Sequence, residues 1–221
     1  MLEKKSNKNN SDELKYWDQK YSVPNAFGEG PTKLALMALE TIKKNQIKTI
    51  LELGCGQGRD SLFFAKQNYA VTSIDFSPEA IDFVSENARM QKLDNIKTIV
   101  QDLRKNFIFK DKFDLLYSNL ALQFFNAKEL GDIFKKIHSS LVNKGHFIFS
   151  TKKSGDKYYG TGIKIAENAY QSSGITRYFF DKNEIEKMLK DKFKVNVFGH
   201  ERHKNLDKTE SVWWYIFCQK K

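Results

Sequence analysis

The chain is poor in cysteine, proline and arginine, and it has no long apolar run. Cys55 and Cys218 are its only cysteines, and two thiols cannot build a disulfide framework, a four-cysteine zinc site or a cysteine-held iron–sulfur cluster. No run of about 18 apolar residues exists, which excludes a membrane-spanning helix. The first ten residues lack the apolar segment of a secretory signal. We therefore expect a cytoplasmic protein without a metal site.

The charge is basic, but lysine carries nearly all of it. The formal net charge is +10, from 37 lysines and arginines against 27 acidic residues. The five arginines are Arg59, Arg89, Arg104, Arg177 and Arg202. Residues 133–164 are the most uneven stretch, with seven lysines against Asp156 alone. Because bidentate contacts to phosphates and bases favour arginine, a solvated lysine-rich surface is the simpler interpretation.

From about residue 47, short apolar runs alternate with amphipathic stretches. This alternation predicts an α/β protein with a doubly wound, mostly parallel sheet that has helices on both faces. The expected strands of this part are 48–53, 70–75, 96–101, 113–118 and 145–150. Two later apolar runs, 193–200 and 211–218, are separated by a polar turn and predict a closing hairpin.

We expect one domain over residues 1–221, because no repeat or low-complexity linker interrupts the chain. Its N-terminal part, residues 1–45, includes a helix that we expect to begin at Pro31 and to carry an apolar stripe. This part either covers a sheet face or forms a helical lid over a ligand at the carboxyl edge of the sheet. The cofactor-binding core is expected over 46–151, and an insertion, a helix and the hairpin over 152–221.

Two local patterns mark helix starts in the later part of the chain. Ser77-Pro78 combines a hydroxyl cap with a proline whose missing amide costs nothing in the first turn. Asp181 and Glu184 form the pattern of a capping box. Residues 151–176 contain four glycines, and we expect an irregular or partly helical insertion there.

A glycine-rich segment directly follows the first expected strand. It reads LELGCGQGRD over residues 51–60, and Gly54, Gly56 and Gly58 stand at alternate positions. Glycines there let the backbone turn tightly and approach a ligand that a Cβ would block. A dinucleotide-binding GxGxxG pattern would have its third glycine at position 59, where this chain has Arg59. The GK[ST] sequence of a P-loop is also absent.

Polar residues also follow the next strands. Asp75 ends the second strand about 20 residues after the glycines, where a carboxylate can bind both hydroxyls of a ribose. Asp102, within Gln101-Asp102-Leu103, ends the third strand, where it can accept from an adenine amino group. Ser118-Asn119-Leu120 closes the fourth strand. Since parallel strands end at one edge of a sheet, we expect these groups to share one site.

With these residues in view, the sequence resembles the class I S-adenosylmethionine-dependent methyltransferases. ELGCGQG resembles the first motif of that family, IDFS the second, QDL the third and FDLLYSNLAL the fourth. The closing hairpin resembles its reversed last strand. The resemblance implies a Rossmann-like methyltransferase fold, with a mostly parallel seven-stranded sheet and an antiparallel last strand.

The resemblance also implies a cofactor, S-adenosylmethionine, and S-adenosylhomocysteine as its product. It assigns the methionine part to Gly54, Gly56 and Gly58 with Glu52 beneath it, the ribose to Asp75, the adenine to Phe76, Asp102 and Leu103, and the sulfonium or acceptor side to Asn119 and Leu120. We add to this cofactor site Arg59 and Gln101, which adjoin the motifs, and the aromatic residues Trp17 and Tyr21. Aromatic rings can stabilise a sulfonium by cation–π contact, although they more often serve packing.

The methyl acceptor is less defined. The chain lacks a [DNS]PP[YFW] motif and a Pro-Cys loop, which argues against methylation of DNA amino groups and of cytosine carbon. The leader Tyr16–Tyr21 and the GxGxGRD segment are similar to thiopurine- and tellurite-resistance-type methyltransferases, which act on small molecules. Gln123 departs from that group, in which histidine is frequent at this position.

Three hypotheses follow. In the first, the chain methylates a small molecule, such as a thiol or chalcogen compound, by in-line displacement. In the second, the acceptor is RNA or protein, and the lysines of 133–164 bind it. In the third, the chain binds the cofactor as a sensor or subunit without transfer. An amine or hydroxyl acceptor needs a general base, for which His200 and His203 are the candidates, although surface positions are the simpler interpretation. The oligomeric state is left open.

Overall fold

The computed structural model describes residues 2–105, 107, 109 and 111–221, with side chains described from Ser11 onward. The helices are α1 (Leu2–Tyr21), α2 (Lys33–Lys44), α3 (Arg59–Lys66), α4 (Pro78–Met90), the short 3-10 helix η1 (Leu122–Phe124), α5 (Ala127–Ser140) and α6 (Lys182–Leu189). The large sheet contains β1 (Thr49–Leu53), β2 (Ala70–Asp75), β3 (Ile96–Val100), β4 (Phe113–Ser118), β5 (Leu141–Lys152), β9 (Phe193–Lys204) and β10 (Glu210–Lys220).

The strand order of this seven-stranded sheet is β3-β2-β1-β4-β5-β10-β9. Strands β1 to β5 pair in parallel, whereas β10 pairs antiparallel with both β5 and β9. The sequence prediction of a mostly parallel sheet with an antiparallel last strand is therefore confirmed. The five expected core strands and the closing hairpin all form, and β5 begins earlier than expected, at Leu141.

Helices cover both faces of the sheet, and each face has its own hydrophobic cluster. Leu130, Ile133 and Phe134 of α5 pack with Phe147 and Phe149 of β5 on one face. On the other face, the inward side of α2 and Phe64 of α3 pack against β1, β4 and β5. Central strands that are buried on both faces read as nearly continuous apolar runs, which explains why the sequence showed them clearly.

The start of α2 differs from the prediction. Thr32 caps the helix and accepts a hydrogen bond from the Ala35 amide, so Pro31 lies just outside the helix rather than at its start. Ser77 caps α4 with Pro78 in the first turn, as expected. Asp181 and Glu184 form the expected capping box of α6.

The insertion, residues 151–176, was predicted to be irregular or partly helical; residues 153–162 are irregular, but the prediction is wrong for 163–176. Residues 163–178 form a small antiparallel sheet of β6 (Ile163–Ala166), β7 (Ala169–Ser172) and β8 (Ile175–Tyr178). The turn between β7 and β8 is Ser173-Gly174, and both residues have positive φ angles, 53° and 77°. A two-residue turn of this kind matches the twist of a hairpin, so Ser-Gly was the hairpin signal in this stretch.

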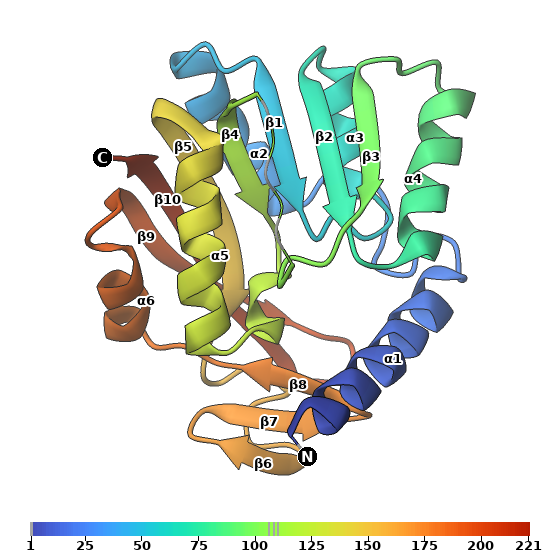
Figure 1. Cartoon of the computed structure of the whole chain (residues 1–221), viewed down its shortest axis with the longest axis vertical. Coiled ribbons are helices and arrows are strands. Elements are labelled where there is room, and N and C mark those ends of the chain that lie inside the picture. The colour runs from blue at the N-terminus through green and yellow to red at the C-terminus, as the bar shows by residue number, and fades with distance from the viewer. Residues whose placement is uncertain (1, 106, 108, 110) are drawn as a thin grey trace.

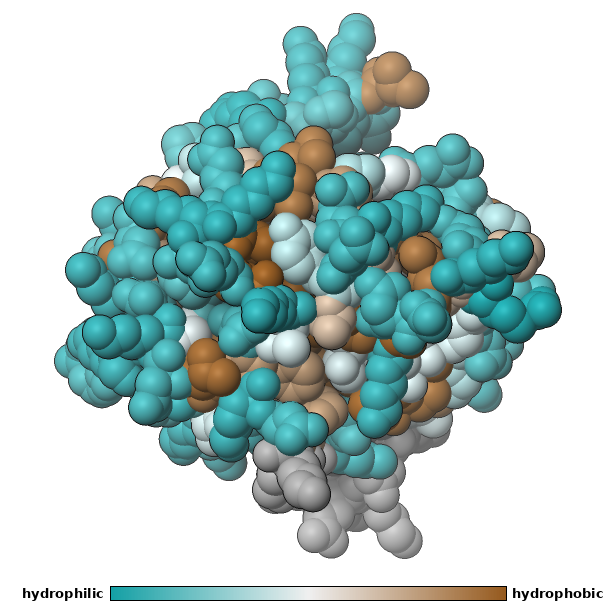
Figure 2. All heavy atoms as spheres, turned by 90° about the horizontal axis from the view of Figure 1, so that it is seen from above, coloured by the Kyte–Doolittle hydropathy of each residue, from teal (hydrophilic) through white to brown (hydrophobic). Residues whose placement is uncertain are grey.

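The arrangement places one edge of the large sheet against α1 and the small sheet. Strands β1 to β4 point with their carboxyl ends toward these two elements in Figure 1. Figure 2 views the molecule from above, onto the opposite edge, which is covered mostly by hydrophilic side chains. Among the described residues, no helix is long and apolar enough to cross a membrane.

Candidate active site

A cavity of about 870 Å³ lies at the carboxyl edge of the large sheet. The turn after β1, the ends of β2, β3 and β4, helix α1 and the loop 25–31 form most of its wall, and Lys152, Tyr158 and Arg177 close it toward the small sheet. Its volume falls within the range of about 300–1,000 Å³ that is typical of small-ligand sites. Of the N-terminal part, α1 therefore lines the cavity, whereas α2 covers a sheet face.

The glycines of the turn after β1 allow two close approaches. Gly54, Gly56 and Gly58 all have positive φ angles, between 52° and 70°. A Cβ on Gly54 would lie 2.4 Å from the Cβ of Ala121, and one on Gly58 would lie 2.5 Å from a methyl group of Val84. Gly54 therefore lets the turn meet the segment after β4, and Gly58 lets α3 pack on α4. Gly58 does not line the cavity, so its contribution is to packing.

Asp75 at the end of β2 is buried and faces this turn. Its two carboxylate oxygens accept hydrogen bonds from the amides of Gly56 (2.9 Å) and Ser77 (3.0 Å). Burial raises the pKa of Asp75 to about 6, although these amides lower it. Each oxygen keeps a further lone pair, so the carboxylate can still accept hydrogen bonds from a ligand in the cavity.

Two more buried acids lie beside the glycine turn. Glu52 accepts a hydrogen bond from the Ser61 hydroxyl, and burial raises its pKa well above the ordinary range. Asp60 accepts from the amide and hydroxyl of Thr32 and from the Tyr117 hydroxyl, each at 2.7 Å. Burial also raises the pKa of Asp60. Asp60 thus connects the start of α2 to α3. Glu52 lines the cavity, and its raised pKa favours the protonated carboxyl.

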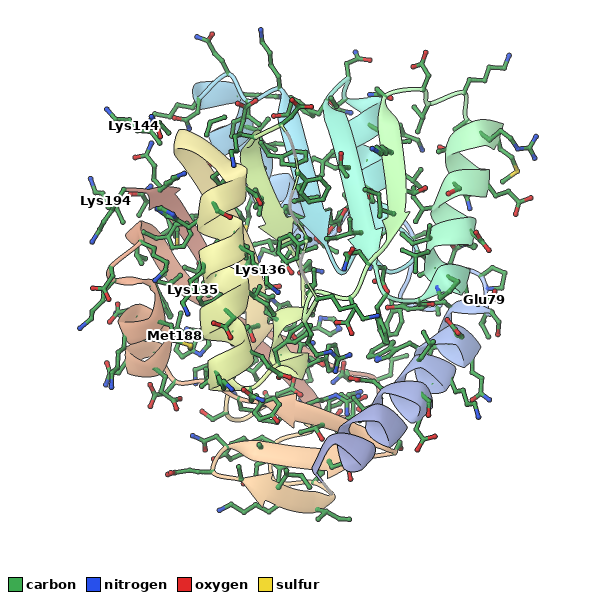
Figure 3. The ribbon with its side chains drawn as sticks, viewed as in Figure 1. Glu79, Lys135, Lys136, Lys144, Met188 and Lys194 are labelled. Carbon is green, nitrogen blue, oxygen red and sulfur yellow. The ribbon has the colours of Figure 1, made fainter. Side chains whose placement is uncertain are left out.

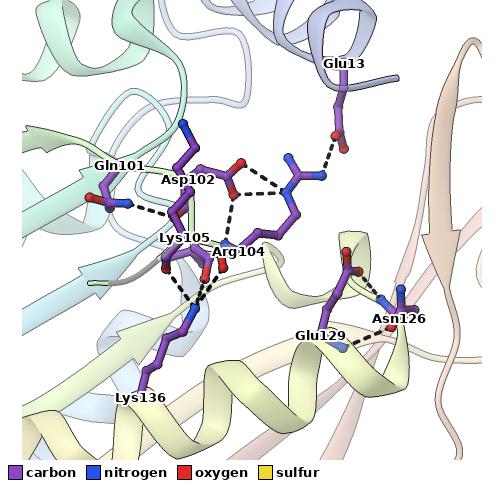
Figure 4. Close-up of polar contacts among 9 residues, drawn as sticks. Glu13, Gln101, Asp102, Arg104, Lys105, Asn126, Glu129 and Lys136 are labelled. Carbon is purple, nitrogen blue, oxygen red and sulfur yellow. Dashed lines mark hydrogen bonds and ion pairs between the residues drawn. The ribbon is translucent and has the colours of Figure 1, made fainter. Parts of the chain in front are cut away.

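Asp102 is already engaged with an arginine. The Nε of Arg104 donates to both carboxylate oxygens of Asp102, at 3.0 and 3.1 Å, and its Nη1 donates to Glu13 of α1 at 3.1 Å. Figure 4 shows this chain of contacts, together with Lys136, which donates to the carbonyls of Leu103, Arg104 and Lys105. The residue expected at the adenine edge is therefore held in place by an arginine that also contacts helix α1.

Gln57 of the first motif and the adjoining Arg59 hold the loop after α1. Arg59 donates to the carbonyls of Phe27, Glu29 and Gly30 at 2.6, 3.1 and 2.7 Å. Gln57 accepts from the Ala26 amide and donates to the carbonyls of Tyr21 and Val23. Arg59 was predicted as a cofactor residue. It lines the cavity, but three of its N–H groups donate to carbonyls of this loop. The sequence analysis did not assign a role to Gln57. The sequence feature that could have indicated one is its position between Gly56 and Gly58, where a long amide side chain can reach neighbouring backbone groups.

Aromatic rings of α1 gather above the glycine turn. Trp17 stacks on Tyr21 with ring centroids 5.6 Å apart, and it meets Phe124 edge-on at 5.0 Å. The Tyr21 hydroxyl is the nearest group to the position of a Cβ on Gly56, at 3.1 Å. All three rings line the cavity, so they serve packing among themselves and also present aromatic surface to a ligand.

The segment after β4 is held in an unusual conformation. Leu120 has a φ angle of 51°, and its amide donates to the Ser150 hydroxyl of β5 at 2.9 Å. The same hydroxyl donates to the Asn119 side chain at 2.7 Å. Gln123 donates to the Leu120 carbonyl, while its own Oε1 is buried and has no hydrogen-bond partner within the described part of the chain. An unpaired buried acceptor on the cavity wall can receive a hydrogen bond from a ligand.

Most predicted cofactor residues meet at the cavity. Its wall includes Trp17, Tyr21, Glu52, Gly54, Gly56, Arg59, Asp75, Phe76, Gln101, Asp102, Leu103, Asn119 and Leu120. His200 and His203, the candidate general bases, do not line it; both are exposed on β9, and His200 packs edge-on against Trp214. The simpler interpretation, surface histidines, fits this placement.

The cavity fits the cofactor that the sequence resemblance implies. The glycine-rich turn after β1 lies beside the buried carboxylate of Asp75 at the end of β2, and the partly buried carboxylate of Asp102 follows β3. This is the position at which open α/β sheets bind nucleosides. Asp75 and Asp102 would hold the nucleoside part, and the turn at Gly54–Gly56 would lie against the methionine part.

Comparison with known proteins gives the same identification. A family model, "Methyltransferase domain", matches residues 50–145. The chain is 27% identical over 141 residues to the probable S-adenosyl-L-methionine-dependent methyltransferase TehB of Haemophilus influenzae, covering 64% of this chain and 46% of that protein. A second TehB sequence, from another strain, is covered over 37% of its length, so the chain spans less than half of these curated relatives.

Solved structures share the fold. TehB from Haemophilus influenzae matches with a TM-score of 0.67 and 20% identity, covering 84% of this chain and 62% of that one. The N-methyltransferase NodS from Bradyrhizobium japonicum, in complex with S-adenosylhomocysteine, matches with a TM-score of 0.71 and 14% identity, covering 94% and 97%.

A third solved structure adds a bound acceptor. It is the 1,6-didemethyltoxoflavin-N1-methyltransferase from Burkholderia thailandensis, with 1,6-didemethyltoxoflavin and S-adenosylhomocysteine bound, and it gives a TM-score of 0.65 at 19% identity, covering 86% and 79%. The fold, the motifs and these matches together identify the cofactor as S-adenosylmethionine. Residues 50–145 therefore match a methyltransferase domain, and the chain is similar in fold and motifs to the S-adenosylmethionine-dependent methyltransferases, TehB among them.

Proposed function

We propose that this protein transfers a methyl group from S-adenosylmethionine to a small-molecule acceptor. The observation that supports the proposal is the cavity: one continuous, partly open space extends from the glycine turn and Asp75 to Lys152 and Arg177. Residues of helix α1 and of β8 in the small sheet line this space. A cavity of this size suits a compact acceptor better than a segment of a macromolecule.

The protein's own contribution is to bind, orient and exclude water. When bound, S-adenosylmethionine supplies an electrophilic methyl group: the acceptor's lone pair forms the new bond to carbon, and the carbon–sulfur bond breaks with its electron pair left on sulfur. Asp75 and Asp102 would hold the nucleoside, and Trp17 and Tyr21 would cover the site from α1. Leu120, fixed by Ser150, would shape the wall near the reacting atoms.

The residues around the cavity favour an acceptor that needs no general base. None of the four histidines lines the cavity. Gln123, at the position where histidine is frequent among similar methyltransferases, cannot take up a proton. A thiol or chalcogen compound that ionises near neutral pH meets this condition, because its anion is already a nucleophile. The toxoflavin methyltransferase provides a precedent on the same fold for a small acceptor.

The alternative of an RNA or protein acceptor has less support. The seven lysines of residues 133–164 do not form one surface. Lys136 reaches inward from α5, whereas Lys135 and Lys144 extend outward (Figure 3). Lys152 is buried in an ion pair with Asp156. These lysines therefore lie in different places: on α5, on the cavity wall and on the exposed surface.

The sensor hypothesis predicts cofactor binding without methyl transfer, so only a measurement of turnover distinguishes it from the other two hypotheses.

The test is a transfer assay read by mass spectrometry. The purified protein is incubated with S-adenosylmethionine and a panel of small thiols, selenols, amines and phenols, with total RNA in parallel. We expect a methylated small molecule together with an equal amount of S-adenosylhomocysteine. Asp75→Ala should lose this activity, while Asp82→Ala, on the exposed side of α4, should keep it. Methylation of RNA alone, or cofactor binding without any product, would contradict the proposal.

A further inference from the structure

Two side-chain amides line the cavity next to the end of β4: Asn119 directly follows the strand, and Gln123 belongs to η1. Across residues 11–105, 107, 109 and 111–221, only two buried side-chain oxygen or nitrogen atoms lack a hydrogen-bond partner, Oε1 of Gln123 and Oγ1 of Thr151. Of these two residues, only Gln123 lines the cavity. Buried acceptors without a partner are rare in folded proteins, so this one requires an explanation.

The orientation of the Gln123 amide is fixed by the backbone of Leu120. The Nε2 group of Gln123 donates to the Leu120 carbonyl, which can only accept. Turning the amide by 180° would place two acceptors against each other, so Oε1 cannot take this bond. Gln123 is only 3% exposed, and burial withdraws Oε1 from bulk water as an alternative partner. The fold therefore leaves a hydrogen-bond acceptor unsatisfied at this part of the wall.

The Asn119 amide is fixed from its oxygen side. The Ser150 hydroxyl accepts a hydrogen bond from the Leu120 amide at 2.9 Å, so its own hydrogen is free to donate, and it donates to Oδ1 of Asn119 at 2.7 Å. Ser150 thus engages the oxygen of the Asn119 amide and not its nitrogen. No group in the described part of the chain accepts a hydrogen bond from Nδ2 of Asn119. Asn119 therefore lines the cavity with free N–H donors.

Leu120 organises both amides. Its N–H sets the orientation of Asn119 through Ser150, and its carbonyl sets the orientation of Gln123. Leu120 has a φ angle of 51°, in the left-handed region that residues with a Cβ rarely adopt. Backbone strain of this kind persists only where the surrounding structure enforces it, and it is frequent at ligand sites. The result is a fixed pair of groups, a donor at Asn119 and an acceptor at Gln123.

This pair lies away from the part of the cavity that we assign to the nucleoside. The strand order is β3-β2-β1-β4-β5, so β1 and its glycine turn separate β4 from β2, which ends at Asp75. The nucleoside is assigned to the ends of β2 and β3, and the methionine part to the turn after β1. The next part of the wall along the sheet is the segment after β4, which leaves it for the methyl acceptor.

We propose that Asn119 and Gln123 bind the methyl acceptor through an uncharged amide or lactam group, whose carbonyl accepts from Nδ2 of Asn119 and whose N–H donates to Oε1 of Gln123. This inference rests on the proposed function and narrows its substrate class. An amide fits because it offers one acceptor and one donor in the same plane. A group without a donor would leave Oε1 unpaired. The acceptor is then an organic molecule, such as a thiol with an amide substituent, and not an inorganic chalcogen anion.

The test compares amides with ketones of the same shape. The protein saturated with S-adenosylhomocysteine is titrated by calorimetry with 2-, 3- and 4-mercaptobenzamide and with the matching mercaptoacetophenones, in which a methyl group replaces the NH₂ group. Three isomers are used because the distance between the sulfur and the amide is not assumed. We expect at least one amide to bind about 5- to 100-fold more tightly than its ketone, because only the amide pairs with the buried Oε1 of Gln123.

Two variants separate the roles of the two residues. Gln123→Met removes Oε1 and should abolish the preference for the amide. Asn119→Asp keeps the oxygen that accepts from Ser150 but replaces the donor by an acceptor, so it should weaken the binding of amide and ketone alike. Gln67→Met, at the exposed C-terminal end of α3, is the control and should bind both probes as the wild type does. A merely structural role of Gln123 would lower both affinities by the same factor and keep their ratio.

The decisive comparison needs no variant. If the wild type binds every amide and its ketone equally, or binds none of them, the inference is overturned. A Gln123→Met protein that keeps the preference would overturn it too. A folded Gln123→Met protein, with the melting temperature of the wild type but weaker binding of S-adenosylhomocysteine, would assign Oε1 to the cofactor and also contradict the inference. Failure of the wild type to bind S-adenosylhomocysteine would instead overturn the proposed function.

Discussion

The carboxylate of Asp75 accepts a hydrogen bond from the Gly56 amide at 2.9 Å, so the end of β2 is joined to the glycine turn that follows β1. Gly56 has a φ angle of 52°, a conformation that most residues with a Cβ rarely adopt. The two residues form one unit: the turn presents its amide to the acid, and the acid is oriented toward the cavity. Loss of either partner should therefore affect ligand binding more than the fold.

Asp75→Asn tests this unit through binding. The substitution keeps the shape of the side chain but removes the charge, and hydrogen bonds to charged groups contribute about 1.5–3 kcal/mol. We expect S-adenosylhomocysteine to bind about 10- to 100-fold more weakly by calorimetry. Asp82→Asn, an exposed acid of α4, is the matched control and should bind like the wild type. Unchanged affinity in Asp75→Asn would show that the ribose is held elsewhere.

The pH dependence of binding follows from the same group. Burial raises the pKa of Asp75 to about 6, so the carboxyl becomes protonated as pH falls through that value. The ionised form accepts more hydrogen bonds, and a ligand that needs it should bind more weakly below pH 6 than above it. We expect calorimetric affinity for S-adenosylhomocysteine to rise from pH 5 to pH 7 in the wild type. The rise should be absent in Asp75→Asn; an equal rise in both proteins would assign it to another group.

Gly58→Ala should destabilise the protein. Its φ angle is 70°, and the added Cβ would lie 2.5 Å from Val84 of α4, which is fully buried. Left-handed backbone costs about 1–2 kcal/mol for alanine, and overpacking adds about 1–3 kcal/mol. The free energy of unfolding measured by urea denaturation should fall by the sum of these two costs. Gly160→Ala is the control, because its φ angle is also positive, 78°, but nothing lies within 4 Å of the added Cβ. Equal losses in the two variants would exclude the steric account.

The sequence predicted the sheet and most of the residues that meet at the cavity, because both depend on local pattern. Buried parallel strands are continuous apolar runs, and the acids that follow them are placed by topology alone. Two roles could not be read in this way. Arg59 holds the carbonyls of the loop 27–30, and Gln57 holds the residues before it, which are contacts across about 30 positions of the chain. Arg177 is one of 37 basic residues in the sequence, and no local pattern predicts its burial or its contacts with the rings of Tyr158 and Phe124.

Arg59→Lys should loosen the loop 27–30. Lysine keeps the charge, but its single ammonium lacks the planar fork whose separate Nε, Nη1 and Nη2 atoms reach the three carbonyls in wild type. We expect faster amide hydrogen exchange over 25–31 and weaker cofactor binding, with the melting temperature nearly unchanged. Arg89→Lys, in the last turn of α4, is the control. If exchange over 25–31 stays at the wild-type rate, Arg59 does not secure the loop.

Ser150→Ala should disturb the segment after β4. The hydroxyl accepts from the Leu120 amide and donates to Asn119, and it is fully buried. Its removal leaves a backbone amide without its partner at a cost of about 1–3 kcal/mol. Stability by urea denaturation should fall by this amount, and methyl transfer should fall further than cofactor affinity. Ser154→Ala, at an exposed position four residues on, should change neither. A loss of stability with full transfer activity would separate Ser150 from the reaction.

The most direct measurement of the central claim is a calorimetric titration of the wild-type protein with S-adenosylhomocysteine near pH 7. We expect saturable binding of one molecule per chain. Adenosine should bind more weakly, because it lacks the homocysteine part that we assign to the turn at Gly54–Gly56. A protein that gives no binding heat, and whose melting temperature does not rise with this ligand, would contradict the assignment of the cavity to S-adenosylmethionine.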